Sequence, residues 1–150
     1  MAAAINSECL ASAIKLIRSK DRFESEVRRA LADKGYQDDL VDPVIEHLIR
    51  RKLISDNRLL ESLIARYSGR RSVGIEKFRA EMMSRGAPEE SIDNCLRDLW
   101  PCNELARGLE ALSAKFKPGD DRSRGARFLL SRGFDDEIVE PILDAFFQAD

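Results

Sequence analysis

One pattern occurs three times along the chain and constrains the fold more than any other feature. Each copy is an apolar stretch that ends in a basic residue and a glycine, at Lys34-Gly35, Arg85-Gly86 and Arg132-Gly133, with the glycines 51 and 47 residues apart. Apolar residues recur 6, 10 and 13 positions after each glycine, and they are Val41, Ile45 and Leu48, then Ile92, Leu96 and Leu99, then Val139, Leu143 and Phe146. Steps of four and three residues describe one face of an α-helix. The chain is therefore built from internal repeats, which decide the choice of fold before other signals are considered.

The basic residue and the glycine together predict the end of a helix. A cation is favoured at the negative C-terminal end of a helix, and glycine adopts the left-handed conformation without a Cβ clash. Each repeat is thus predicted to hold a helix, a tight turn at Gly35, Gly86 or Gly133, and a second helix. A further amphipathic segment precedes each pair, over residues 7–19, 56–68 and 101–116. The pattern predicts three helices in each of three units and no convincing strand.

The repeats indicate an all-α fold class. One helical-repeat domain is expected over residues 1–150, with units at approximately 6–52, 53–100 and 101–150. Because a single small unit buries little apolar surface, neighbouring units should stack along one direction. The expected molecule is elongated, with a curvature that stacking can introduce.

Local signals predict where some helices begin. Asp21 and Glu24 have the spacing of a capping box. Pro88 suits the first turn of the helix that follows Gly86. Pro43 and Pro141 recur at the same offset in the first and third units, and each is expected to delay or kink its helix.

The composition excludes several classes of protein. No apolar run approaches the roughly 20 residues of a membrane span, and residues 1–9 lack the basic and then apolar order of a signal peptide. A cytoplasmic protein without a membrane partner is expected. Cys9, Cys95 and Cys102 form no CxxC pair and are expected to be small core residues. With His47 as the only histidine, disulfide frameworks and most zinc sites are excluded, so no metal or cofactor is expected.

No set of residues indicates catalysis. His47 lies beside Leu48 and Ile49 in a helical segment and is expected to be a partly buried helix residue rather than a general base. Gly69 and Gly74 flank two arginines, but no Gly-Lys-Ser/Thr sequence follows, so a phosphate-binding loop is not predicted. The chain is expected not to be an enzyme, and no catalytic residue is assigned.

Charge is distributed unevenly, although the formal net charge is only -2. Residues 50–71 carry seven basic and two acidic residues, whereas residues 135–150 carry six acidic residues and no basic one. The seven basic residues of the middle segment are the candidate contacts to an anionic partner, and they are Arg50, Arg51, Lys52, Arg58, Arg66, Arg70 and Arg71. Solvated helix faces are the alternative interpretation, and for any one residue the two interpretations have about equal weight.

Four segments carry a family resemblance. Residues 26–35 read EVRRALADKG, residues 52–60 read KLISDNRLL, residues 74–82 read GIEKFRAEM and residues 127–134 read RFLLSRGF. They are similar, in this order, to the patterns E-L-x-x-x-L-x-x-K-G, G-x-[IL]-D-D-x-R-F-A, G-x-x-[KR]-I-x-x-E-L and F-L-x-R-R-G-F of the RecX family, which are bacterial regulators of the RecA recombinase. The match spans nearly the whole chain and agrees with the threefold repeat found independently.

The chain departs from the family pattern at several helix-start and packing positions. Ser55 stands where the family usually has its first Asp, Lys52 replaces a usual Gly, and Phe23 occupies a usual Ser or Thr position. Leu59 and Leu60 replace Phe and Ala. These departures bear on family membership more than on the fold.

The resemblance implies a function. It implies a small, monomeric, non-enzymatic protein that lies along the groove of the RecA filament on single-stranded DNA and inhibits strand exchange and ATP hydrolysis. The DNA within the filament is a further potential contact.

Two alternatives stay open, a helical-repeat adaptor and a helix-turn-helix DNA reader, whose second helix would enter the major groove. The helices after the glycines carry many acids, among them Asp38, Asp39, Glu89, Glu90 and Asp135, which would face phosphates unfavourably.

Overall fold

The computed structural model describes residues 4–100 and 104–147, and within these ranges the chain forms helices and no strand. The first unit comprises α1 (Ser7–Ser19), α2 (Glu24–Asp33) and α3 (Asp38–Arg50). The second comprises α4 (Asp56–Arg66), the short 3-10 helix η1 (Gly69–Arg71), α5 (Ile75–Arg85) and α6 (Glu89–Leu99). The third comprises α7 (Glu104–Lys115), α8 (Arg122–Ser131) and α9 (Asp136–Phe146). The predicted all-α repeat fold is confirmed.

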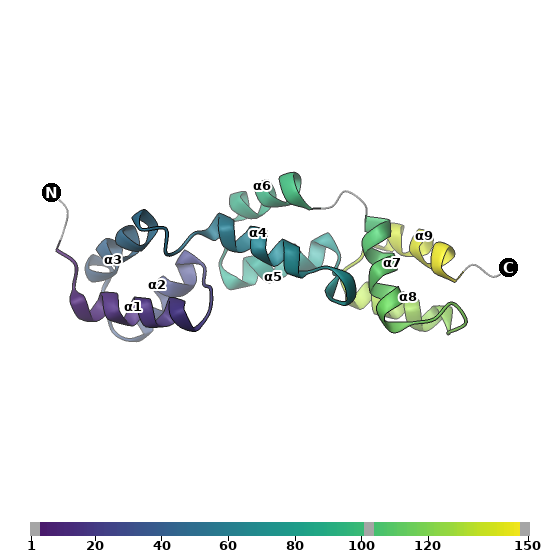
Figure 1. The fold of residues 1–150 in the computed structure, drawn as a ribbon, viewed down its shortest axis with the longest axis horizontal. Helices are drawn as coiled ribbons and strands as arrows, with labels where there is room; N and C mark the ends of the chain where they lie inside the picture. The colour runs from purple at the N-terminus through teal and green to yellow at the C-terminus, as the bar shows by residue number, and fades with distance from the viewer. Residues whose placement is uncertain (1–3, 101–103, 148–150) are drawn as a thin grey trace.

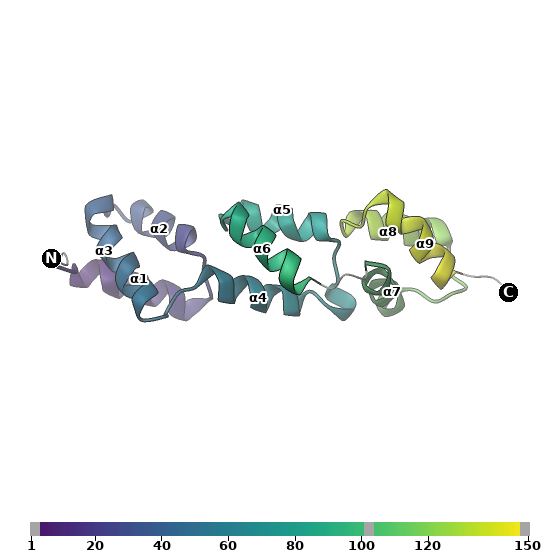
Figure 2. The ribbon, with the colours of Figure 1, turned by 90° about the horizontal axis from the view of Figure 1, so that it is seen from above.

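The three units follow one another along the long axis of the molecule. Figures 1 and 2 show the first unit at one end, the third at the other, and α4 lying along the second unit between its two neighbours. Each unit has its own cluster of buried apolar side chains, as the periodicity predicts. Cys9 and Cys95 are buried members of two of these clusters, and Cys102 lies outside the described residues. The elongated shape thus follows from three small cores placed in a row.

The turn glycines adopt the left-handed conformation that was expected. Gly35, Gly86 and Gly133 have φ values of 95, 94 and 84°. At each turn the N–H of the residue after the glycine donates to the carbonyl five residues earlier, as in Tyr36 N to Leu31 O at 3.2 Å and Phe134 N to Leu129 O at 3.2 Å. This is the hydrogen bond of a Schellman motif, which satisfies carbonyls at the helix end.

The start of α2 differs from the prediction. Asp21 and Glu24 form no capping box, because the residue before the helix is Phe23, which has no side-chain acceptor. The Glu26 carboxylate instead accepts a hydrogen bond from the Phe23 backbone N–H at 2.8 Å. The two helix prolines also differ, since α3 and α9 begin five residues before Pro43 and Pro141, so neither proline delays its helix.

The ends of the first helix of each unit differ in detail. The predicted helix over 7–19 is confirmed, but the one over 56–68 ends at Arg66, before η1. The third starts at Glu104 in the described residues, and positions 101–103 lie outside them. His47 is partly buried on α3, as expected.

Leu99 differs from its repeat equivalents in burial. Its side chain is 47% exposed, whereas its repeat equivalent Leu48 is fully buried. α6 ends at Leu99, and the next residue, Trp100, is the one that packs into the core cluster of the second unit. The Trp100 ring lies 5.1 Å from the ring of Phe78, centroid to centroid, and is 6% exposed.

The junction between the first and second units is formed by side chains. Phe23 starts in the first unit but is fully buried in the core cluster of the second. Arg85 of α5 lies 4.9 Å above the Phe23 ring, forms an ion pair with Glu26 at 2.9 Å and donates to the Asp21 carbonyl at 3.3 Å. Burial alone would raise the pKa of Glu26, but the hydrogen bonds from Arg85 and from the Phe23 N–H outweigh it and lower this pKa. Unit one is therefore held to unit two by an aromatic ring under a paired arginine.

The junction between the second and third units brings backbones together. The Gly74 N–H donates to the Arg132 carbonyl at 2.7 Å, and a Cβ on Gly74 would lie 2.0 Å from the Gly133 carbonyl oxygen. The Arg132 guanidinium donates to the Ser72 carbonyl at 3.2 Å, which is the contact that Arg85 makes with Asp21 at the other junction. Arg107 is buried here and donates to the Tyr67 carbonyl at 2.6 Å. The basic residue before the glycine thus binds the preceding unit at both junctions.

Candidate functional site

The seven basic residues singled out from the sequence lie at both ends of α4. Arg50, Arg51 and Lys52 are at the end of α3 and in the loop before α4, while Arg70 and Arg71 belong to η1, which follows it. Arg58 and Arg66 are on α4 itself, which is about 16 Å long at 1.5 Å per residue. All seven are exposed. The structure therefore divides them between the two junctions instead of placing them in one patch.

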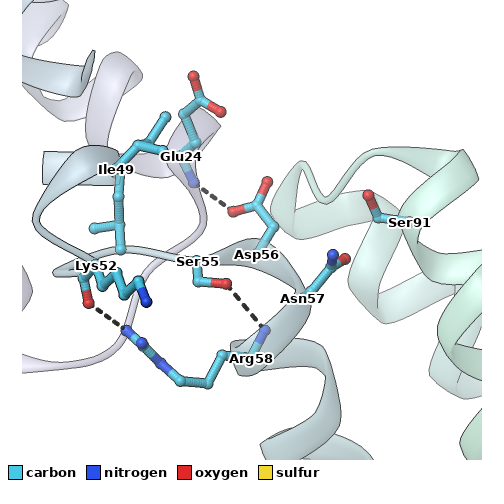
Figure 3. Close-up of a pocket in the computed structure, with 9 residues that line it drawn as sticks. Glu24, Ile49, Lys52, Ser55, Asp56, Asn57, Arg58 and Ser91 are labelled. Carbon is cyan, nitrogen blue, oxygen red and sulfur yellow. Dashed lines mark hydrogen bonds between the residues drawn. The ribbon is translucent and has the colours of Figure 1, made fainter. Parts of the chain in front are cut away.

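Arg58 has a structural contact that the sequence did not indicate. Its guanidinium donates to the Lys52 carbonyl at 3.0 Å, and its backbone N–H donates to the Ser55 hydroxyl at 3.3 Å (Figure 3). The neighbouring Asp56 carboxylate accepts a hydrogen bond from the Glu24 N–H at 2.9 Å, which links α4 to the start of α2. Burial raises the pKa of Asp56. The segment similar to the family's D-D-x-R pattern thus stabilises the first junction.

The other six side chains form no hydrogen bond or ion pair within the described part of the chain. They are those of Arg50, Arg51, Lys52, Arg66, Arg70 and Arg71. Their donors can therefore bind an external group.

A groove with a basic wall runs along α4 on the side of the first unit. It consists of two hollows of about 230 and 410 Å³, which share Ile17, Asp21 and Leu59 in their walls. Its basic residues come from the end of α1, from α4 and from the end of α5, and they are Arg18, Lys20, Arg22, Arg58, Arg66 and Arg85. Asp21 is the single acid in either wall. We refer to this feature as the basic groove.

The basic residues of the groove fall into two sets. Three are held by the protein, since Arg22 donates to the Leu16 carbonyl at 3.1 Å, and Arg58 and Arg85 form the contacts described above. Arg18, Lys20 and Arg66 have no hydrogen bond or ion pair among the described side chains. Because none of these three side chains is held in an ion pair with a described carboxylate, their N–H donors are available to a polyanion such as a nucleic-acid backbone.

Four of these residues were not predicted. Arg18, Lys20 and Arg22 lie close together in the sequence, and this short basic run was the available signal. The excess of positive charge along the sequence is larger between residues 50 and 71, which is why the sequence favours that segment. The sequence identifies Arg85 only as a cation at the end of a helix, because the stacking of the units is what brings it beside α1 and α4.

The opposite side of α4 is acidic. A hollow of about 420 Å³ between α4 and α6 is lined by Glu61, Glu90 and Asp98, with no basic residue in its wall. Asn57 and Glu61 are four residues apart and share the helix face toward this hollow, whereas Leu59, Leu63 and Arg66 share the opposite face. α4 therefore separates a positive from a negative surface of the second unit.

Two classes of site find no support in the described residues. No group of three His, Cys, Asp or Glu side chains within residues 4–100 and 104–147 is arranged to hold a metal ion. In the same ranges, no helix is both long and apolar enough to cross a membrane.

The fold and these surfaces define an all-helical tandem-repeat protein with a basic groove on one side of α4 and an acidic hollow on the other. A family model for the first three-helix domain of RecX matches residues 9–48. Regulatory protein RecX of Pseudomonas entomophila is 34% identical over 137 residues, which cover 88% of this chain and 87% of that protein. Regulatory protein RecX of Chlorobium limicola is 28% identical over 145 residues, 95% of this chain and 91% of that protein. The chain belongs to the RecX family of regulatory proteins.

Solved structures agree on the fold. The crystal structure of RecX from Lactobacillus salivarius is similar with a TM-score of 0.76 and 19% sequence identity, covering 93% of this chain and 94% of that one. A second RecX crystal structure has a TM-score of 0.71 and covers 92% of this chain.

Proposed function

We propose that this protein binds the filament that a RecA-type recombinase forms on single-stranded DNA and inhibits the recombinase. Membership of the RecX family supports a regulatory role, and the basic groove is the observation that carries the proposal further. Arg18, Lys20 and Arg66 direct unpaired charge into a groove that crosses from the first unit to the second. An elongated molecule with such a groove suits a long anionic partner.

The groove also favours this proposal over operator reading by a helix-turn-helix. A DNA reader would place α3, α6 or α9 in the major groove. These helices begin with exposed acids, namely Asp38 and Asp39, Glu89 and Glu90, and Asp136 and Glu137. The basic groove is formed mainly by α1 and α4, so the positive surface lies on other elements.

The test is ATP hydrolysis by the cognate recombinase on single-stranded DNA, measured with increasing amounts of the purified protein. The parent should slow hydrolysis. The variant R18E/R66E should require about tenfold more protein for the same inhibition, because charge reversal removes two cations from the groove. K15E/R29E is the matched control, since both residues are exposed and line neither hollow of the groove. No inhibition by several-fold excess of the parent would refute the proposed function.

Arg70 and Arg71 provide a second, independent variant. They lie in η1 at the other junction and are exposed. R70E/R71E should keep its fold and inhibit less, with a weaker dependence on salt, because fewer anionic contacts remain to be screened. Inhibition equal to that of the parent across a salt series would leave the basic groove as the contact and exclude η1.

A further inference from the structure

The third unit has a second basic hollow, which is separate from the basic groove. It lies between the end of α7 and α8 and has a volume of about 270 Å³. Three cations, two phenylalanines and one serine line it, namely Lys115, Arg124, Arg127, Phe116, Phe128 and Ser131. No acid lines it. We call this feature the α8 pocket.

Aromatic rings, and not carboxylates, lie beside two of the three cations of the α8 pocket. The Lys115 Nζ lies 4.8 Å from the centroid of the Phe128 ring, and the Arg124 Cζ lies 5.8 Å from that of Phe116. Both rings are almost buried in the core of the third unit, at 7% and 9% exposure. A ring attracts a cation through its negative face but accepts no strong hydrogen bond. The rings therefore position these charges and leave their N–H donors unoccupied.

None of the three cations forms a side-chain hydrogen bond or ion pair with the described residues. Arg122, on the same helix, behaves differently, because it binds Glu140 at 2.9 Å and Asp144 at 2.7 Å on α9. In the first unit Arg28 is likewise paired with Asp42 at 2.6 Å. On α8, Arg122 is therefore held in ion pairs within the third unit, whereas Arg124 and Arg127 are not.

We propose that the α8 pocket binds phosphate groups of the single-stranded DNA backbone. Three cations that converge on one hollow match a phosphodiester, whose non-bridging oxygens accept several charge-assisted hydrogen bonds, and the planar guanidinium groups of Arg124 and Arg127 suit this geometry. The inference deepens the proposed function and rests on it for the choice of DNA as the polyanion. The pocket is a contact to the strand itself, formed by the third unit without the recombinase.

The experiment measures binding of a fluorescent oligothymidylate to the full chain, without recombinase, by anisotropy over a salt series. R124Q/R127Q should bind about tenfold more weakly than the parent, and its log-log salt slope should fall by about 1.4, since each contact to a single strand contributes about 0.7. R122Q is the control on the same helix and should change the affinity less than twofold.

The outcomes separate this inference from the proposed function. Equal affinity and salt slope for the parent and R124Q/R127Q, or no binding by the parent, would overturn the α8 pocket even if the parent inhibits the recombinase. Loss of binding in R124Q/R127Q with no inhibition by the parent would support the pocket and refute the proposed function. Displacement of the oligonucleotide by inorganic phosphate only at concentrations far above those of DNA phosphate would support a polymer ligand. Displacement by free phosphate at equal phosphate concentration, or by polyglutamate more readily than by unlabelled DNA, would overturn it.

Discussion

The two junctions between units are built from equivalent residues but are packed differently. A large side chain fills the junction between the first and second units, whereas the backbones themselves meet at the junction between the second and third. In both, a basic residue and a glycine turn of one unit contact the start of the middle helix of the unit before it. At the first junction, the position before that helix is Phe23, whose ring enters the neighbouring core. At the second, the equivalent position is Gly74, whose missing side chain lets the Gly133 carbonyl approach.

This difference shows that one repeat geometry tolerates two solutions. A large side chain such as that of Phe23 can extend into the next unit when that unit leaves space for it. A glycine such as Gly74 suits the same position when the backbones of the two units are in direct contact. The two junctions should therefore fail under opposite substitutions, one when a side chain is removed and the other when one is added.

The largest effect is expected for Phe23→Ala. Removal of a fully buried ring leaves a cavity in the second unit and takes away the partner of Arg85, at a cost of about 4 kcal/mol in the free energy of unfolding. Chemical denaturation measures this cost. A loss below about 1 kcal/mol would contradict the assignment of Phe23 to the second core.

Gly74→Ala should be next, at about 3 kcal/mol, because the new Cβ would lie 2.0 Å from the Gly133 carbonyl oxygen and force the units apart. Gly119→Ala is the matched control, since a Cβ there meets nothing within 4 Å. The two variants are compared by thermal unfolding. Equal melting temperatures would mean that the second junction is not closely packed.

A smaller effect, of about 1 kcal/mol at neutral pH, is expected for Glu26→Gln, which weakens the pair with Arg85 at the first junction. The pKa of Glu26 is lowered in the folded chain, so its contribution is present above the unfolded pKa of about 4.3 and is lost as the pH falls through the folded pKa. Denaturation midpoints of parent and variant should converge once the pH falls below the folded pKa of Glu26. A difference that persists there would assign the loss to packing instead of charge.

The smallest effect has the opposite sign. Lys52, in the loop that leads to the first junction, has a φ of 58°, a conformation that costs a residue with a Cβ about 1 kcal/mol. Lys52→Gly should therefore raise the free energy of unfolding by only about 0.5 kcal/mol. The relief of backbone strain is partly offset by the greater conformational entropy of glycine in the unfolded chain. Lys34→Gly, at a position with a φ of -82°, should destabilise and provides the comparison.

The fold could be predicted from the sequence because each repeat carries its own signals. Helix periodicity and the glycine turns are patterns among residues less than fifteen positions apart. They can therefore be recognised in one sequence without knowing how the units pack. Phe23 and Lys52 were visible only as departures from the family pattern. The structure explains Phe23, because its ring packs in the core of the second unit. Lys52 has a left-handed backbone, which is the conformation that glycine adopts most easily, and glycine is the usual residue of the resembled pattern at this position.

The candidate site was predicted less well for a physical reason. The basic groove joins Arg18 and Lys20 to Arg66, which is more than forty residues away, and no sum of charge along the sequence registers such a neighbour. The sequence signal also treated Arg58 as free, although its guanidinium binds a backbone carbonyl. Contacts across a junction depend on how the units stack. The stacking is determined by residues such as Gly74 and Phe23, which carry no charge.

The turn at Gly35 is open, since a Cβ on Gly35 meets nothing within 4 Å, while the equivalent turns at Gly86 and Gly133 are covered by the preceding unit. The two ends of the row of units are therefore different, because only the first unit has an uncovered glycine turn. Reversing the molecule end for end does not reproduce its surface, so the order of its charged features has a sense of direction. If the protein lies along a DNA strand as proposed, whose 5′ and 3′ ends also differ, its two possible orientations on that strand are not equivalent.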